Sequence, residues 1–183
     1  MNHKGLYEVH AMKHNVILIG FMGSGKTSVG IRLAERLSYR FCDSDQMIEK
    51  KVAKTINQIF SLHGEEHFRN LETELLKELS VDMTHHVLST GGGLPMRKQN
   101  GEQLQEMGFV VFLKATKETT VQRLKGDTSR PLLKGEELEQ KVERMLSIRT
   151  PIYEKAAHKI IATDGRSIDE IVNLIMESYI RVI

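Results

Sequence analysis

Hydrophobic residues gather in five short runs along the chain, and the segments between them repeat apolar positions at helical spacing. The runs are Val16–Ile19, Tyr39–Cys42, His86–Leu88, Phe109–Leu113 and Lys159–Ala162. Each run is short and mostly apolar, which predicts strands buried on both faces of a sheet. The long connections between them suit crossover helices, so we expect an α/β fold with a five-stranded parallel sheet flanked by helices.

Helical periodicity marks most of the connecting segments. We expect helices at Lys26–Ser38, Asp45–Lys54, Ile56–Leu62, Glu65–Leu79, Arg97–Glu106, Lys117–Leu124, Gly135–Thr150, Ile152–Ala157 and Ser167–Val182. Two regions interrupt a simple strand–helix alternation, about 46–79 and 126–135. Ligands of open α/β sheets bind beyond the carboxyl ends of the strands, where such excursions can reach them. The second region suits a flap over phosphates, with a solvated loop as the alternative.

Length and composition fit one globular domain. The chain has 183 residues, 40% of them hydrophobic and 27% charged, with a net charge of +2. We expect a single domain over 15–183 preceded by a flexible extension over 1–14. The charge gives no support for a nucleic-acid partner, and no run approaches the ~20 apolar residues of a membrane span. The single Cys42 excludes an internal disulfide and favours a cytoplasmic location.

The strongest chemical signal is a glycine-rich loop between the first strand and the first helix. Residues 20–27 read G-F-M-G-S-G-K-T. In such a P-loop, backbone N–H groups and the helix N-terminus surround phosphate oxygens. The lysine reaches the β- and γ-phosphates and the final hydroxyl ligates Mg²⁺. We expect nucleotide contacts from Gly23, Ser24, Gly25, Lys26, Thr27 and Ser28; the alternative is a glycine-rich turn with a surface lysine.

Two carboxylates follow the second predicted strand. Asp43 and Asp45 come at its C-terminal end, on the same edge of the sheet as the P-loop. One could act on the magnesium through water, and the other could accept a proton from an attacking hydroxyl. The alternative is that Asp45 simply caps the next helix.

Three glycines and four arginines complete the candidate site. Gly91, Gly92 and Gly93 follow the third strand, which indicates a close approach of a ligand to the backbone; a loose turn before Pro95 is the alternative. Guanidinium groups suit carboxylates and phosphates because they donate two parallel hydrogen bonds. Isolated arginines are ordinarily surface charges, and spacing alone does not show that these converge. The arginines are Arg69, Arg123, Arg130 and Arg149.

Together these motifs closely resemble the shikimate kinases, in order and approximate spacing, over about residues 15–180. The matching elements are Gly20–Thr27, Asp43-Ser44-Asp45 with Ile48-Glu49, Gly64-Glu65 with Phe68-Arg69 and Glu72, Gly91–Gly93, Arg123 with Arg130-Pro131-Leu132-Leu133, and Arg149 with Pro151 and Tyr153. One departure is Ala53-Lys54, where many members have a glycine before the Ser/Thr-Ile stretch. Several motifs in one order are more specific than a P-loop alone.

The resemblance implies a P-loop NTPase of the nucleoside-monophosphate-kinase-like fold, expected as a monomer. Its reaction transfers the γ-phosphoryl group of ATP to the 3-hydroxyl of shikimate, giving shikimate 3-phosphate and ADP on the route to aromatic amino acids. Shikimate would be bound by Asp45, Arg69, Gly91–Gly93 and Arg149. Asp45 would also be the base, with Arg69 and Arg149 on the substrate carboxylate.

At the nucleotide end, the resemblance implies ATP as co-substrate with Mg²⁺ as cofactor. Thr27 would hold the metal with support from Asp43 through water. Arg123 would lie against the adenine, and Arg130 would close over the phosphates with a lid at about 126–135. Lys26 and Arg130 would neutralise charge during transfer, and the segment at about 46–79 would bind the substrate.

Two other functions share part of this pattern. A kinase for another small polyol acid, such as gluconate, also needs a P-loop and a basic pocket; the three glycines with Arg69 and Arg149 favour shikimate. A nucleotide-dependent switch is the second alternative. It is disfavoured because the chain has no Asn-Lys-x-Asp run and no Asp-x-x-Gly element.

Overall fold

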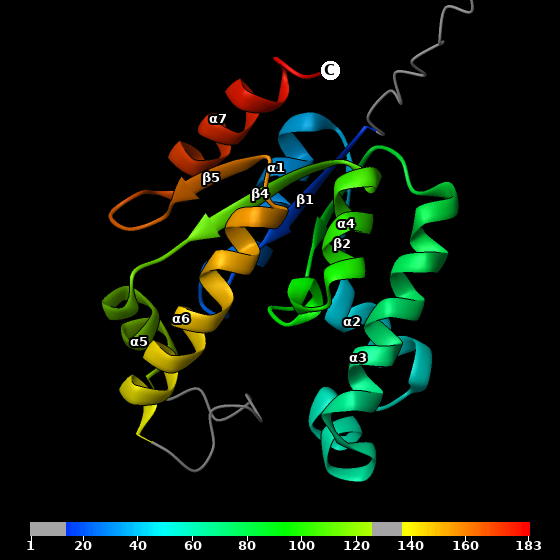
Figure 1. Cartoon of the computed structure of the whole chain (residues 1–183). Helices are drawn as coiled ribbons and strands as arrows, with labels where there is room; N and C mark the ends of the chain where they lie inside the picture. Colours follow the sequence, from blue (N-terminus) through cyan, green and yellow to red (C-terminus); the bar gives the residue numbers. More distant parts are fainter. Residues whose placement is uncertain (1–13, 126–136) are drawn as a thin grey trace, which may run out of the picture.

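The computed structural model describes residues 14–125 and 137–183, which form one parallel sheet between layers of helices (Figure 1). The strands are β1 (Asn15–Ile19), β2 (Arg40–Asp43), β3 (His86–Ser89), β4 (Phe109–Lys114) and β5 (Lys159–Ala162). Their order is β2-β3-β1-β4-β5, and all neighbouring pairs are parallel. The predicted five-stranded parallel sheet is confirmed.

The helices follow the expected order, and most ends lie close to the predicted ones. They are α1 (Lys26–Leu37), α2 (Ser44–Val52), α3 (Ile56–Asp82), the short 3-10 helix η1 (Leu94–Met96), α4 (Lys98–Met107), α5 (Lys117–Leu124), α6 (Leu138–Ala156) and α7 (Ile168–Tyr179). The two helices expected within 56–79 form one element, α3. It is interrupted at Gly64, whose backbone is non-helical at φ 81° and ψ 172°.

The prediction of a helix break at Pro151 was wrong, because α6 continues through this proline. Proline removes one backbone hydrogen bond and crowds the preceding turn, which disfavours a helix interior. Here Val142 before the proline and Tyr153 after it are both fully buried in the same core. Tertiary packing on both sides therefore outweighs the local preference. As a result, Arg149 and Tyr153 lie one turn apart on a single helix face.

The strands carry two opposite faces, each covered by its own helices. Val16 and Leu18 of β1 belong to a core with α1 and α7. Ile17 and Ile19 point the other way, into a core that includes residues of α3, α4 and α6. Figure 1 shows α7 and α1 on one side of the sheet and α4 and α6 on the other. Burial on both faces explains why the strands read as nearly continuous apolar runs.

A third, smaller core fixes the excursion after β2. Ile48 of α2 packs with Ile59, Phe68 and Leu75 of α3. These residues lie on both sides of Gly64, so apolar packing holds the two parts of α3 and the preceding helix together. The segment that carries Arg69 is therefore anchored to the domain by its own cluster.

Cys42 lies half-buried on β2, with its Sγ 3.8 Å from the carbonyl oxygen of Val87. Burial raises the pKa of its thiol to about 11, and the charge of Asp43 acts in the same direction. The thiol therefore stays protonated at neutral pH, which agrees with a packing role.

Two predicted segments fall wholly or mainly outside the described residues: the N-terminal extension and the lid with Arg130. In the part of the chain that the structure describes, no helix combines the length and apolar character that a bilayer crossing requires.

Asn15 ties the start of β1 to three other segments. Its Nδ2 donates to the carbonyl oxygens of Met83 at 2.9 Å and Met107 at 2.8 Å, and its Oδ1 accepts from the amide of His86 at 3.0 Å. The side chain is fully buried. Losing it would leave two buried carbonyls and one partly buried N–H without this partner.

Asn15→Ala should therefore lower the free energy of unfolding by about 2–4 kcal/mol, from several unpaired buried groups of about 1–3 kcal/mol each. Urea unfolding measures the change. Asn173→Ala, at an exposed site on α7, is the control and should stay within about 0.5 kcal/mol of the unmodified chain. Equal stabilities for the two variants would show that the Asn15 bonds do not hold the strand.

Candidate active site

The loop between β1 and α1 has the backbone of a phosphate cradle. Gly25 immediately precedes α1 at φ 92°, a left-handed conformation that favours glycine. Among the described residues, no side chain caps this helix end, so its first N–H groups remain directed at the loop. A helix N-terminus of this kind binds anions through its amides and its dipole.

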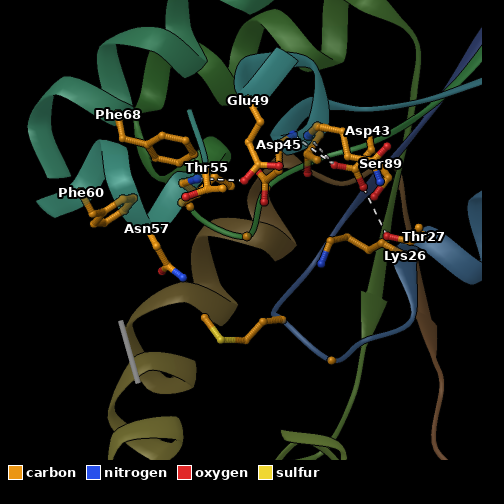
Figure 2. A pocket seen from close by; sticks show the side chains of 18 of the residues that line it. Lys26, Thr27, Asp43, Asp45, Glu49, Thr55, Asn57, Phe60, Phe68 and Ser89 are labelled. Atoms are coloured by element: carbon orange, nitrogen blue, oxygen red, sulfur yellow. Dashed lines mark hydrogen bonds between the residues drawn. The ribbon is translucent and has the colours of Figure 1, made fainter. Parts of the chain in front are cut away.

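Lys26 is held directly over this loop. Its Nζ donates to the carbonyl oxygens of Gly20 and Phe21, each at 2.9 Å. Figure 2 shows its side chain extending into the cavity next to the loop. The position of its ammonium group fits a role in binding phosphate oxygens.

Asp43 links the nucleotide loop to helix α2. Its Oδ1 accepts from the amides of Asp45 at 3.0 Å and Gln46 at 3.4 Å, which makes Asp43 the N-cap of α2. Its Oδ2 accepts from the Thr27 hydroxyl at 3.3 Å. The alternative reading of Asp45 as the cap was therefore wrong: α2 begins at Ser44, two residues earlier than a helix capped by Asp45 would begin, and Asp45 lies in its first turn.

The glycine loop after β3 touches this second carboxylate and Arg69. A Cβ atom at Gly91 would lie 2.3 Å from Asp45 Oδ1, and one at Gly93 would lie 2.1 Å from Arg69 Nη1. Both distances are far below van der Waals contact. The glycines therefore allow charged side chains to approach the backbone, and the loop ends in η1 rather than in a loose turn.

Arg149 and Tyr153 hold the middle of the glycine loop from α6. The Tyr153 hydroxyl donates to the Gly92 carbonyl at 2.5 Å, and Arg149 Nη1 donates to the same oxygen at 3.5 Å. Burial raises the pKa of Tyr153 to about 12, so its hydroxyl keeps its proton. The Arg149 guanidinium also lies over the Phe21 ring, 5.6 Å from its centre. Arg149 thus reaches both the glycine loop and the P-loop.

Arg69 has two carboxylate partners on its own helix. Its Nη1 donates to Glu72 at 2.7 Å, and its Nη2 donates to Glu65 at 2.8 Å. Arg69 is 8% exposed and Glu72 is fully buried, whereas the Glu65 side chain is 50% exposed. Arg69 therefore has one internal partner and one partner at the surface.

Glu72 is the most perturbed carboxyl group of the site. Its Oε2 binds Arg69, and its Oε1 has no hydrogen-bond partner within the described residues. Burial raises the pKa of Glu72 to about 7; Arg69 opposes this shift, and the nearby charge of Asp45 supports it. Glu72 therefore changes charge close to neutral pH.

A continuous cavity of about 620 Å³ connects these groups. Figure 2 shows Lys26, Thr27 and Asp43 in one part of it and Asn57 and Phe60 in another. The cavity is lined by Gly23, Gly25, Lys26, Thr27, Ser28, Asp43, Asp45, Arg69, Gly91, Gly92, Gly93 and Arg149, and also by Glu49, Thr55, Asn57, Phe60 and Phe68. The phosphate cradle and the acid- and arginine-lined pocket therefore open onto each other.

Two predicted residues within the described part of the chain do not line this cavity, and a third is not described. Ser24 is buried within the P-loop. Arg123 of α5 donates to the Gly23 carbonyl at 2.9 Å and so contacts the P-loop from α5. Arg130 lies outside the described residues.

Sequence reasoning assigned no role to Glu72 or Tyr153, although both stood among the matching residues. Glu72 could have been found from its spacing, three residues after Arg69, which places both on one helix face. A helical glutamate is usually exposed, however, and its burial follows only from the packing of α3. The contact of Tyr153 with Gly92 required α6 to continue through Pro151.

A P-loop at the carboxyl edge of a parallel sheet, facing a second polar pocket, defines a P-loop kinase with the nucleoside-monophosphate-kinase-like fold. A family model described as shikimate kinase matches residues 22–179. Shikimate kinase from Thermodesulfovibrio yellowstonii is 40% identical over 168 residues, covering 92% of this chain and 96% of that protein. The chain therefore belongs to the shikimate kinase family.

Solved structures agree with this assignment. Shikimate kinase from Acinetobacter baumannii in complex with shikimate superposes with a TM-score of 0.88 at 40% identity, covering 93% of this chain and 95% of that chain. A gluconokinase from Sinorhizobium meliloti has a TM-score of 0.59 at 17% identity over 93% of this chain and 94% of that one, a likeness that concerns the fold alone.

Glu72→Gln should change how stability depends on pH between about 4.5 and about 7. In this window the folded chain keeps the Glu72 proton and the unfolded chain releases it. The contribution of Glu72 is therefore complete below pH 4.5 and is lost as the pH rises through about 7. Glutamine does not titrate, so the variant should gain stability relative to the unmodified chain as the pH rises, by up to ~1.4 kcal/mol per pH unit.

Urea unfolding across this pH range measures the difference. Glu74→Gln, which replaces an exposed carboxylate of the same helix, should show a difference that hardly changes with pH. If Glu72→Gln instead loses stability relative to the unmodified chain as the pH rises, the pKa of Glu72 is depressed and not raised.

Proposed function

We propose that this protein transfers the γ-phosphoryl group of ATP to the 3-hydroxyl of shikimate, giving shikimate 3-phosphate and ADP. The observation that carries this proposal is the shared cavity, in which a P-loop faces a pocket with a carboxylate and two arginines. Membership of the shikimate kinase family and the likeness to a relative in complex with shikimate support the choice of substrate.

In the nucleotide half of the cavity, Gly23, Ser24, Gly25, Lys26, Thr27 and Ser28 would surround the phosphates of ATP. Backbone amides and the start of α1 supply donors for phosphate oxygens, and Lys26 adds a charge. Arg123 would lie against the adenine, a role consistent with its bond to the Gly23 carbonyl. The role of Arg130 and of the lid remains a prediction from the sequence.

Thr27 and Asp43 fit a magnesium ion. Their oxygen atoms lie side by side, with the Thr27 hydroxyl 3.3 Å from Asp43 Oδ2, and Mg²⁺ prefers such hard oxygen ligands. No group of three or more His, Cys, Asp or Glu side chains suited to a metal occurs in residues 14–125 and 137–183. Mg²⁺ takes few protein ligands and keeps water and phosphate oxygens. When bound, the ion neutralises charge on the phosphates.

In the other half, Asp45, Arg69, Gly91–Gly93 and Arg149 would bind shikimate. Arg69 and Arg149 would hold the carboxylate of the substrate, since both guanidinium groups line the cavity. Asp45 would accept hydrogen bonds from the substrate hydroxyls. The segment 46–79 would serve as the substrate-binding segment of a single domain, because it contributes Asn57, Phe60, Phe68 and Arg69 to the lining.

Catalysis would rest on alignment and charge neutralisation. Phosphoryl transfer leaves little covalent chemistry to the protein, so holding the hydroxyl in line with the γ-phosphate provides much of the acceleration. Asp45 would orient the attacking hydroxyl and take its proton, while Lys26 would stabilise charge on the transferred group. Cytoplasmic location and the monomeric state remain predictions.

An ADP-release assay with separate additions of shikimate, quinate and gluconate tests the proposed activity. We expect ATP turnover that depends on shikimate and is much lower with the other two acids. Strong turnover with gluconate and none with shikimate would favour the kinase for another polyol acid. Tight binding of GTP without ATP binding or shikimate-dependent turnover would favour a nucleotide switch.

Asp45→Asn should reduce shikimate-dependent kcat by roughly 10²–10⁴-fold, the usual contribution of a positioned general base. The amide keeps the shape of the carboxylate and removes its ability to take a proton. Glu49→Gln is a matched control, because Glu49 also lines the cavity but accepts from the Ile56 amide at 2.8 Å. Unchanged kcat in Asp45→Asn would assign the proton to another group.

A further inference from the structure

Two histidines lie next to each other on α3, on either side of the Gly64 bend. The ring centres of His63 and His67 are 4.8 Å apart, with an angle of 51° between the ring planes. Both residues are exposed, and within the described part of the chain neither imidazole has a hydrogen-bond or ion-pair partner. No polar contact among the described residues therefore holds the two rings in place.

The same bend brings a second pair of side chains together. Phe60 and Phe68 pack with ring centres 5.1 Å apart, and both line the cavity. Each pair joins the part of α3 before Gly64 to the part after it: the aromatic pair on the cavity side, and the imidazole pair in solvent. The angle between the two parts of α3 at Gly64 therefore determines the position of Asn57 and Phe60 relative to Arg69.

We propose that His63 and His67 form a binding site for a divalent transition-metal ion such as Zn²⁺, which bridges the Gly64 bend. Imidazole nitrogens are preferred ligands of Zn²⁺, Ni²⁺ and Cu²⁺. Histidines four residues apart form a frequent pair of zinc ligands on a regular helix, and here the two rings lie equally close although Gly64 between them is non-helical. Two nitrogens bound to one zinc ion lie roughly 3.3 Å apart, from Zn–N bonds of about 2.0–2.1 Å, and rings 4.8 Å apart can reach this by small rotations.

Neighbouring carboxylates have other partners. Glu65 pairs with Arg69 at 2.8 Å, and Glu66 pairs with Arg97 at 2.5 Å. The remaining positions of the metal ion are therefore filled by water. The site is distinct from the Thr27 and Asp43 pair, because it uses nitrogen ligands on the exposed side of α3. A bound ion would tie the two parts of α3 together and hold the bend in one angle.

Zinc binding to the full-length chain tests the site, measured without nucleotide or Mg²⁺ by competition with a chromophoric chelator. We expect His63→Gln and His67→Gln each to lose one zinc equivalent, or to bind it at least ~10-fold more weakly, because one imidazole alone lacks the second, tethered ligand. His10→Gln, which changes a histidine elsewhere in the sequence, should keep this equivalent. Identical binding curves for the unmodified chain and both α3 variants would overturn the proposal.

Hydrogen exchange tests the effect on the bend. Zinc should slow amide exchange over residues 56–70 in the unmodified chain and in His10→Gln, and should leave it unchanged in His63→Gln and His67→Gln. Thermal unfolding with EDTA should be the same for the unmodified chain, His63→Gln and His67→Gln, since both replaced side chains are exposed. Zinc-dependent protection of this segment in His63→Gln would place the ion elsewhere. Neither readout requires kinase activity, so the site can fail while the proposed function stands.

Discussion

A Cβ atom at Gly91 or Gly93 would displace a charged side chain, and this steric limit shapes the cavity at the carboxyl edge of the sheet. Asp45 Oδ1 and the Arg69 guanidinium occupy the positions that Cβ atoms would need. Between these two glycines, the Gly92 carbonyl oxygen accepts a hydrogen bond from the Tyr153 hydroxyl, so α6 also holds the loop in place. Charged groups from α2 and α3 can therefore meet a rigid peptide surface at the carboxyl edge of the sheet, directly beside the P-loop.

The parts of this arrangement that depend on local sequence could be predicted. The strands were found because burial on both faces requires apolar residues at nearly every position, as in Val16–Ile19. The P-loop was found because its glycines, lysine and threonine are adjacent in the chain. The predicted substrate-binding residues came from the family resemblance. Asp45, Arg69 and Arg149 are far apart in the sequence, and their spacing alone did not show that they lie close together.

The parts that depend on tertiary packing could not be predicted in this way. The start of α2 decides which aspartate caps it, and this start lies two residues earlier than a cap at Asp45 would need, so Asp43 has that role. Pro151 indicated a helix end, but buried residues on both sides hold α6 together. The high pKa of Glu72 follows mainly from its complete burial, which a helix-face pattern does not reveal. In each case a long-range contact outweighed a local preference.

The charges around Arg69 are already balanced by the protein itself. One of its partners, Glu72, is fully buried, whereas the side chain of the other, Glu65, is half exposed to solvent. In the proposed mode of binding, an incoming acid would compete with Glu65 for the Arg69 guanidinium, so that recognition would be an exchange of one carboxylate for another. A neutral analogue cannot take part in this exchange. Under this proposal, selectivity for a carboxylate would arise without an uncompensated positive charge in the empty pocket.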